Sequence, residues 1–188
     1  MKTLPKIAIL ASGTASNAAN IVNQMHKVSA EIVLLISNNS QSGIFNIGTQ
    51  NNIATKLFNS KSENALLEIL QNANVEYIIL AGYLKLIPKN VVKKFSNKIL
   101  NIHPALLPKY GGKGMYGRHV HQAVFKNNEP KTGITIHLVN EEFDKGEILF
   151  QKDIAIIDCK SAEEIAQKVQ ELEYEFYPQI IQKFISTS

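Results

Sequence analysis

Two polar side chains that could stabilise a negatively charged oxygen stand two residues apart, at the end of an apolar run. Asn101 and His103 flank Ile102 in the segment Asn-Ile-His-Pro. If residues 99–102 form a buried strand, alternation directs both side chains to the same face. An amide N–H beside an imidazolium is the kind of donor pair that stabilises the oxyanion of a tetrahedral intermediate. The pair therefore indicates acyl-transfer chemistry.

Asp144 is a carboxylate that could act together with this pair. It lies in a turn that contains Gly146, between two strand-like runs, although turns also favour Asp and Gly for local reasons. A carboxylate close to His103 would favour the charged imidazolium, raise its pKa and fix its tautomer. No serine or cysteine nucleophile is evident near Asn101 and His103, which suggests direct attack by the substrate's own nucleophile. The functional interpretation of Asp144 depends on a contact with His103.

The turn after the first apolar run could bind an anion. Residues 11–17 read Ala-Ser-Gly-Thr-Ala-Ser-Asn and come directly before a helical pattern. Hydroxyl groups and free backbone N–H groups at a helix N-terminus favour a negative charge, so a phosphate fits there. The turn lacks the G-x-G-x-x-G pattern and the P-loop lysine, which argues against a dinucleotide or a nucleoside triphosphate. Ordinary helix capping is the alternative explanation.

Apolar runs alternate with helical patterns over the first hundred residues. Strands are predicted at 6–11, 31–36, 77–81 and 99–102, and helices at 18–25, 43–51 and 62–72. Alternating strands and helices indicate a parallel sheet, and ligands of such sheets bind at the carboxyl ends of the strands. The turn after residue 11 and the pair Asn101 and His103 both belong to that edge.

The pattern changes after Asn101. A proline- and glycine-rich segment, a short helix, two strands and a long amphipathic helix are predicted at 104–117, 118–126, 133–139, 148–157 and about 161–185. The two strands follow each other closely, so we expect them to pair antiparallel at the sheet edge. The chain 1–188 is thus expected to be a single-domain α/β fold. It would contain a mostly parallel twisted sheet with flanking helices and an antiparallel strand pair near the C-terminus.

Composition and charge exclude several classes of protein. A chain of 188 residues fits one domain, and 45% apolar residues are ordinary for a folded protein. The net charge of +4 comes from scattered lysines, so no nucleic-acid tract is indicated. The single cysteine, Cys159, excludes an internal disulfide. No apolar run is long enough for a membrane span or a signal peptide, so we expect a cytoplasmic protein without membrane or nucleic-acid partners.

Four blocks in this order resemble the phosphoribosylglycinamide formyltransferases. They are Ser-Gly-x-x-Ser-Asn in the first turn, Leu-Ala-Gly-Tyr at 80–83, Asn-Ile-His-Pro-Ala-Leu-Leu-Pro at 101–108, and Asp144. The resemblance covers nearly the whole chain, and the third block is specific to the wider superfamily of folate-dependent formyltransferases. It implies the formyltransferase fold. It also implies transfer of the formyl group of 10-formyltetrahydrofolate to the amine of glycinamide ribonucleotide, in de novo purine synthesis.

The resemblance assigns roles to individual residues. Asn101 and His103 would stabilise the oxyanion, His103 would donate a proton, and Asp144 would keep His103 protonated and help to relay the proton. It implies a cis peptide bond between Leu107 and Pro108, 10-formyltetrahydrofolate as cosubstrate, and no metal. The residues assigned to glycinamide ribonucleotide are Ala15, Ser16, Asn17, Gln170 and Glu173, and those assigned to folate are Lys61, Leu84, Lys85, Leu86, Ile87 and Asn101. For Glu173 a solvated helix face is the alternative.

Three features depart from the family pattern. Ala15 stands where relatives usually carry glycine, which costs backbone freedom if this residue needs a positive φ. Lys61 and Lys85 stand where arginine is common, and lysine lacks the two-pronged hydrogen-bonding group of arginine. Residues 111–117 lengthen a loop that is shorter in some relatives.

Other activities remain open. A sugar-amine N-formyltransferase would use the same Asn, His and Asp groups and the same donor, and a ligand-binding module could keep the fold without turnover. A metal-dependent hydrolase would rest on His119 and His121, but no nearby carboxylate completes a zinc site, and helix-surface or loop positions explain both histidines. Methionyl-tRNA formyltransferases and formyltetrahydrofolate deformylases carry extra domains that we do not expect in 188 residues. Monomer and homodimer are both open.

Overall fold

The computed structural model describes residues 3–58 and 64–186, and within these ranges seven strands form one sheet. The strands are β1 (Lys6–Leu10), β2 (Glu31–Ser37), β3 (Thr55–Leu57), β4 (Tyr77–Leu80), β5 (Ile99–His103), β6 (Lys131–Leu138) and β7 (Ile148–Ala155). The helices are α1 (Ser16–Met25), α2 (Ile44–Asn51), α3 (Ala65–Asn72), α4 (Lys89–Lys94), α5 (Arg118–Lys126) and α6 (Ala162–Ser186). None of these helices is both long and apolar enough to cross a membrane.

The sheet has a parallel part and an antiparallel part, as predicted. The strand order is β3-β2-β1-β4-β5-β6-β7, in which the first five strands pair parallel. β6 runs antiparallel to β5, and β7 runs antiparallel to β6. The elements expected from the sequence are present in the described residues, with boundaries shifted by a few positions. β3 and α4 are additions to that prediction: with three and six residues, they are too short to show a periodic pattern.

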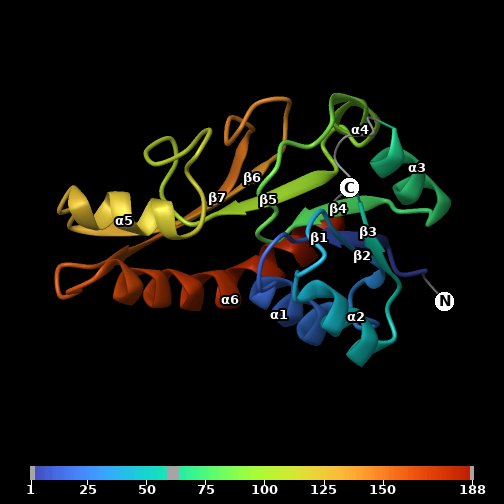
Figure 1. The fold of residues 1–188 in the computed structure, drawn as a ribbon, viewed down its shortest axis with the longest axis horizontal. Coiled ribbons are helices and arrows are strands. Elements are labelled where there is room, and N and C mark those ends of the chain that lie inside the picture. Colours follow the sequence, from blue (N-terminus) through green and yellow to red (C-terminus); the bar gives the residue numbers. More distant parts are fainter. Residues whose placement is uncertain (1–2, 59–63, 187–188) are drawn as a thin grey trace.

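Alternation along the central strands divides the core into two layers. Ile7 and Ile9 of β1 face the side of the sheet where α1, α2 and α6 pack, and Ala8 and Leu10 face the side of α3 and α4. Figure 1 shows the first group of helices below the sheet and the second group above it. All four side chains are fully buried. Because both faces of the parallel strands are covered, their sequences are nearly continuous apolar runs.

β7 forms the long exposed edge of the sheet. Among the described residues it pairs with β6 alone, and most of its side chains are exposed. Ile148 and Leu149 are 44% and 41% exposed, and the charged residues Lys152 and Asp153 follow in the second half of the strand. The opposite edge, β3, has only three residues.

Tyr177 anchors the long helix α6 to the centre of the sheet. Its side chain is fully buried, and its hydroxyl shares one proton between the carbonyl oxygens of Leu80 at 2.8 Å and Leu100 at 3.2 Å. Leu80 is the last residue of β4, and Leu100 directly precedes Asn101 in β5. Tyr177 therefore links α6 to the two strands that lead into the candidate site.

Replacing Tyr177 by phenylalanine should lower the free energy of unfolding by about 1–3 kcal/mol, because two buried carbonyl groups lose a hydrogen-bond donor. Urea unfolding followed by circular dichroism measures the change. Tyr174→Phe is the control, since Tyr174 lies on the same helix and is only half-buried. It should change the free energy by less than about 0.5 kcal/mol. If the free energy of unfolding of Tyr177→Phe equalled that of the wild type, the prediction would be wrong.

Candidate active site

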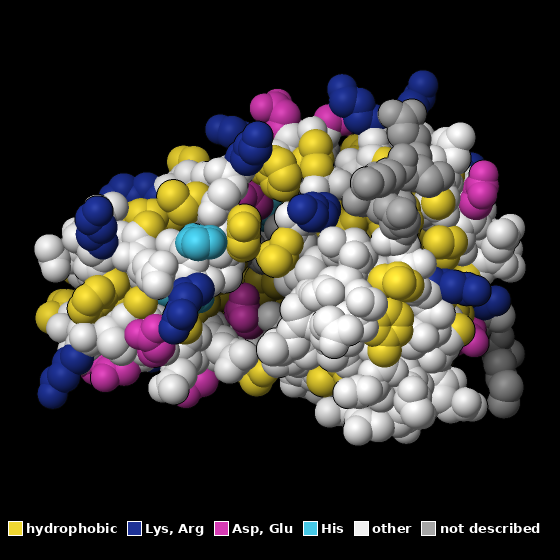
Figure 2. Space-filling view, viewed as in Figure 1, with side chains coloured by type: hydrophobic (Ala, Val, Ile, Leu, Met, Phe, Trp, Pro, Cys, Tyr) yellow, Lys and Arg dark blue, Asp and Glu magenta, His cyan; other side chains and the backbone are white. Residues whose placement is uncertain are grey.

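A cavity of about 610 Å³ opens at the carboxyl ends of the parallel strands. Its walls come from the first turn, from the segments after β4 and β5, and from the loop between β6 and β7. Figure 2 shows the hollow near the middle of this face, with acidic side chains deep inside it. Asn101, His103 and Asp144 all line the cavity, at the edge where the sequence places its candidate residues.

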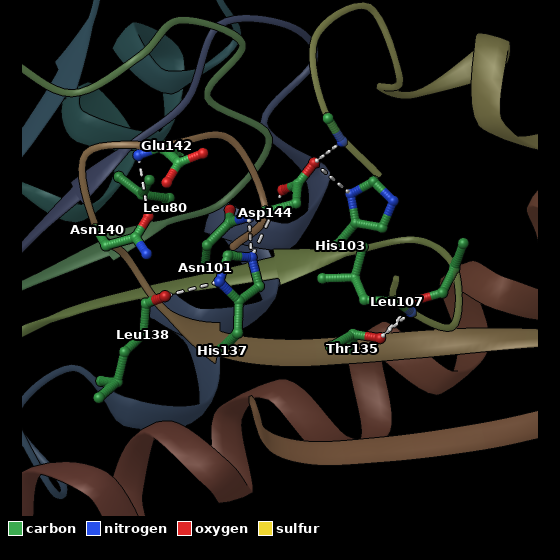
Figure 3. Close-up of polar contacts among 12 residues, drawn as sticks. Leu80, Asn101, His103, Leu107, Thr135, His137, Leu138, Asn140, Glu142 and Asp144 are labelled. Carbon is green, nitrogen blue, oxygen red and sulfur yellow. Dashed lines mark hydrogen bonds and ion pairs between the residues drawn. The ribbon is translucent and has the colours of Figure 1, made fainter. Parts of the chain in front are cut away.

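Asn101 and His103 project from the end of β5. Figure 3 shows both side chains on the same side of the strand, as the alternation predicts. Asn101 Nδ2 lies 3.0 Å from His137 Nε2, and His103 Nε2 lies 2.8 Å from the carbonyl oxygen of Tyr110. A carbonyl oxygen only accepts, so His103 Nε2 carries a hydrogen and donates it to Tyr110. The other ring nitrogen of His103, Nδ1, faces Asp144.

The carboxylate of Asp144 lies between two imidazole rings. Its Oδ2 atom is 3.6 Å from His103 Nδ1, and its Oδ1 atom is 3.6 Å from His137 Nε2 (Figure 3). The backbone N–H of Gly112 donates to Oδ2 at 2.8 Å and helps to hold the carboxylate in place. The contact between Asp144 and His103, on which the interpretation of Asp144 depends, is therefore present.

Burial outweighs the carboxylate in setting the charge of His103. Burial lowers the pKa of His103, whereas the charge of Asp144 and the hydrogen bond to Tyr110 raise it, and the net pKa is below the ordinary value for histidine. Asp144 raises this pKa as predicted, but burial is the larger effect, because the ring is almost completely removed from water. Burial raises the pKa of Asp144. The interactions with His137 and His103 lower this pKa by more than burial raises it, so the net pKa lies below the ordinary value for aspartate.

His137 is a member of the site that the sequence analysis misses. Its Nδ1 atom donates to the carbonyl oxygen of Leu138 at 2.7 Å, and its Nε2 atom lies 3.6 Å from Asp144 Oδ1 and 3.0 Å from Asn101 Nδ2. The second of these Nε2 contacts orients the Asn101 amide with its nitrogen toward His137. The only signal in the sequence is a histidine within the strand-like run at 133–139; its place directly opposite Asn101 follows from the register of β6 against β5.

The first turn and α6 bring together the five residues that the resemblance assigns to glycinamide ribonucleotide. Ala15 precedes α1 with a φ of 62°, so the departure from glycine falls where the backbone is left-handed. No side chain caps α1, which leaves backbone N–H groups of its first turn to an anion. Asn17 Nδ2 donates to Glu173 Oε2 at 3.0 Å, and Gln170 Nε2 donates to Ser16 Oγ at 3.3 Å. Gln170 is exposed beside the cavity, and the other four residues line it.

Glu173 is a carboxylic acid in the cavity wall rather than part of a solvated helix face. The side chain is partly exposed as a whole, but its carboxyl group lies against Asn17. Burial raises the pKa of Glu173 to about 7, and the hydrogen bond from Asn17 lowers it only in part. Glu173 can therefore carry a proton near neutral pH and donate a hydrogen bond into the cavity.

Glu173→Gln should change how stability depends on pH. The pKa of this group is about 7 in the folded chain and about 4.5 in the unfolded chain, so its ionisation destabilises the folded state as the pH rises between these values. The free energy of unfolding of the variant, relative to that of the wild type, should increase by about 2 kcal/mol as the pH rises from about 5 to about 8. Urea unfolding at several pH values measures this change. Glu171→Gln, an exposed carboxyl on the same helix, is the matched control. A stability difference that stays constant with pH would overturn the prediction.

The segment after β4 forms an apolar wall of the cavity. Leu84, Lys85, Leu86 and Ile87 all line it; Leu84 and Leu86 are partly exposed and Ile87 is buried. Lys85 adds a positive charge to this wall. Lys61, the other lysine that the resemblance assigns to folate, lies outside the described residues.

The glycine-rich segment 111–117 closes the cavity on the side of Asp144. Residues 112–117 line the cavity, and the Gly112 N–H is bonded to the Asp144 carboxylate. A side chain at Gly111 would come within 2.5 Å of Leu107 Cδ2 and would crowd Asp144. The lengthened loop is therefore part of the site.

Thr135 holds the segment that leads from β5 into this loop. Its hydroxyl accepts the N–H of Leu107 at 3.0 Å and donates to the carbonyl oxygen of Ala105 at 2.7 Å. Figure 3 shows the bond between Thr135 and Leu107. The peptide bond between Leu107 and Pro108 is cis, which confirms the prediction.

His121 also lines the cavity, whereas His119 lies on the surface of α5. The expectation of a helix-surface or loop position is therefore right for His119 and wrong for His121, because His121 turns toward His103 and is buried. Burial, followed by the charge of His103, lowers the pKa of His121 to about 4, so its ring is neutral near pH 7. Over residues 3–58 and 64–186, no three His, Cys, Asp or Glu residues are grouped so that they could hold a metal ion.

Comparisons with known proteins agree with this geometry. The family model described as "Formyl transferase" matches residues 5–181. The phosphoribosylglycinamide formyltransferase of Haemophilus influenzae is 36% identical over 96% of this chain and 87% of its own length. The chloroplastic enzymes of that name from Arabidopsis thaliana and Vigna unguiculata are 38% and 36% identical, and this chain spans 64% and 60% of their lengths.

Solved structures show the same fold. The crystal structure of phosphoribosylglycinamide formyltransferase from Brucella melitensis is 33% identical, with a TM-score of 0.85 over 97% of this chain and 96% of that chain. The predicted fold class, with its mostly parallel sheet and antiparallel C-terminal strands, is confirmed. The chain therefore belongs to the formyl transferase family, and the relatives described here are phosphoribosylglycinamide formyltransferases.

Proposed function

We propose that this chain transfers the formyl group of 10-formyltetrahydrofolate to the amine of glycinamide ribonucleotide, in purine synthesis. The observation that carries the proposal is the meeting of Asn101, His103 and Asp144 in one cavity. This cavity lies between a turn suited to a phosphate and an apolar wall suited to a folate ring. The names of the relatives support this acceptor.

The two substrates would bind against different walls of the cavity. The N–H groups of the first turn, at 15–17, would hold the phosphate of glycinamide ribonucleotide, and Gln170 and Glu173 would contact the rest of this substrate. The residues proposed for the folate are Leu84, Lys85, Leu86 and Ile87, with Lys61 for its tail. Both substrates then meet at Asn101 and His103, which lie between these walls.

The amine nitrogen attacks the formyl carbon, and the carbonyl electrons move onto the oxygen to give a tetrahedral oxyanion. Asn101 would stabilise it with the N–H that is not bonded to His137, and protonated His103 would supply the second donor. The intermediate collapses when the bond from carbon to N10 of the folate breaks. N10 then gains a proton, and the former amine nitrogen loses one.

The proton donor would be His103 Nδ1. The Nε2 atom is held by the carbonyl oxygen of Tyr110, so it is not free to exchange its proton with a substrate. Nδ1 faces Asp144, whose charge favours the protonated ring. Asn101 and His103 supply the donors that this mechanism requires, so the proposal includes no metal ion.

The test is an assay of the purified protein with 10-formyl-dideazafolate, in which release of the deformylated product is followed. Release that requires glycinamide ribonucleotide would support the proposal. Release that instead requires an amino-sugar nucleotide would favour a sugar-amine formyltransferase, and release without any amine would indicate a hydrolase. Tight binding of the donor without release would favour a non-catalytic module. The single domain, the cytoplasmic location and the monomer or homodimer remain predictions.

A further inference from the structure

A buried serine, Ser12, joins the ends of three neighbouring strands. It lies in the turn after β1, and its side chain is only 6% exposed. It is not among the residues that line the cavity. Its hydrogen bonds instead reach the segments after β4 and after β2, on either side of β1 in the sheet.

On the β4 side, Ser12 makes two bonds to the start of the apolar wall. Its backbone N–H donates to the carbonyl oxygen of Gly82 at 3.0 Å, and its Oγ atom accepts the N–H of Leu84 at 3.1 Å. Gly82 has a φ of +78°, so the chain turns sharply there. The residues from 81 to 88 belong to no helix or strand, so side-chain hydrogen bonds such as this one are needed to hold them.

On the β2 side, two asparagines fix Ser12 itself. The hydroxyl donates its only proton to Asn38 Oδ1 at 2.6 Å, which leaves an oxygen lone pair for the N–H of Leu84. Asn39 Nδ2 donates to the carbonyl oxygen of Ser12 at 3.0 Å. Asn38 therefore sets the direction of the hydroxyl, and the hydroxyl sets the position of Leu84.

We propose that Ser12 is a positioning residue that holds the apolar wall at 84–87 in register with the anion-binding turn, and so determines the affinity for the folate donor. The inference rests on the proposed function, because it concerns the wall that we assign to folate. Within the described residues, no hydrogen bond joins the side chain of Asn101 or His103 to Ser12. Loss of its hydroxyl should therefore affect donor binding much more than the chemical step.

Ser12→Ala should raise the KM for the formyl donor about tenfold, because the Leu84 N–H loses its acceptor and the wall is no longer fixed. We expect kcat and the KM for glycinamide ribonucleotide to change by less than about threefold. Ser42→Ala is the matched control. Ser42 is equally buried and its hydroxyl donates to the carbonyl oxygen of Gly13 at 3.0 Å, but it makes no bond to the segment 84–87.

A double-mutant cycle tests whether Asn38 acts through Ser12. Asn38→Ala should also raise the KM for the donor. Adding it to Ser12→Ala should produce little further change, since both substitutions disturb one chain of hydrogen bonds. Ser12→Thr, which restores a hydroxyl, should recover most of the affinity. Additive effects of the two alanine substitutions would contradict the proposed order of action.

A measurement without substrates separates this inference from the proposed function. In ¹⁵N-labelled protein, exchange of the Leu84 amide hydrogen should be about tenfold faster in Ser12→Ala than in the wild type, and unchanged in Ser42→Ala. An inactive wild type would reject the proposed function. An active wild type whose Ser12→Ala variant keeps a normal KM for the donor, or raises both KM values and lowers kcat together, would reject only the role of Ser12.

Discussion

His103→Ala should lower kcat for formyl transfer by at least about a thousandfold. The variant loses an oxyanion donor and the proton donor in one change, and either loss alone costs about two to three orders of magnitude. The KM values should change little, because neither the first turn nor the segment 84–87 contacts the His103 ring by a hydrogen bond. Steady-state kinetics with both substrates varied measures the effect.

His119→Ala is the control for this experiment. His119 is the second residue of α5, it is exposed on the surface of this helix, and it does not line the cavity. It should keep wild-type kinetics. A His103→Ala variant with more than about a tenth of the wild-type kcat would show that the imidazole is not the proton donor.

Asp144→Asn should lower kcat at neutral pH by about a hundredfold. The amide can still accept the Gly112 N–H, so the main change is the loss of a negative charge 3.6 Å from His103 Nδ1. That charge raises the pKa of His103 against the effect of burial, so without it the pKa falls further and less of the ring is protonated. Activity that requires protonated His103 should therefore decline at a lower pH in the variant, and the kcat profile should shift toward acid.

Asp153→Asn serves as the control for charge removal, since Asp153 is exposed on β7 and paired with Lys131. Its pH profile should match that of the wild type. If Asp144→Asn lowers kcat equally at every pH, Asp144 acts through geometry alone and not through the charge of His103.

Much of the framework could be predicted from the sequence because it depends on local patterns. The apolar runs at 6–11 and 77–81 are short and rich in isoleucine, which favours buried strands, and period-two alternation places Asn101 and His103 on one face of β5. The positive φ of Ala15 does not follow from its place before a helix, because residues at this position usually adopt the β region; the signal is that the family which the sequence resembles usually carries glycine there.

The rest depends on contacts between distant parts of the chain. His137 joins the site only because β6 pairs with β5 in one particular register, and a shift by one residue would turn it to the other face. The direction of the pKa shift of His103 depends on how completely the ring is buried, which a spacing pattern does not reveal. The bonds of Ser12 to Asn38 and Leu84 span three strands, and nothing near Ser12 in the sequence indicates them.

The exposed strand β7 bears on how this protein avoids aggregation. Its outer row of N–H and C=O groups is a template on which a strand of another molecule could add, and Ile148 and Leu149 would favour such growth. Lys152 and Asp153 oppose it, because an added strand would have to cover two charged side chains. Charged residues on an edge strand are one of the features that disfavour intermolecular sheet extension, a requirement that is independent of catalysis.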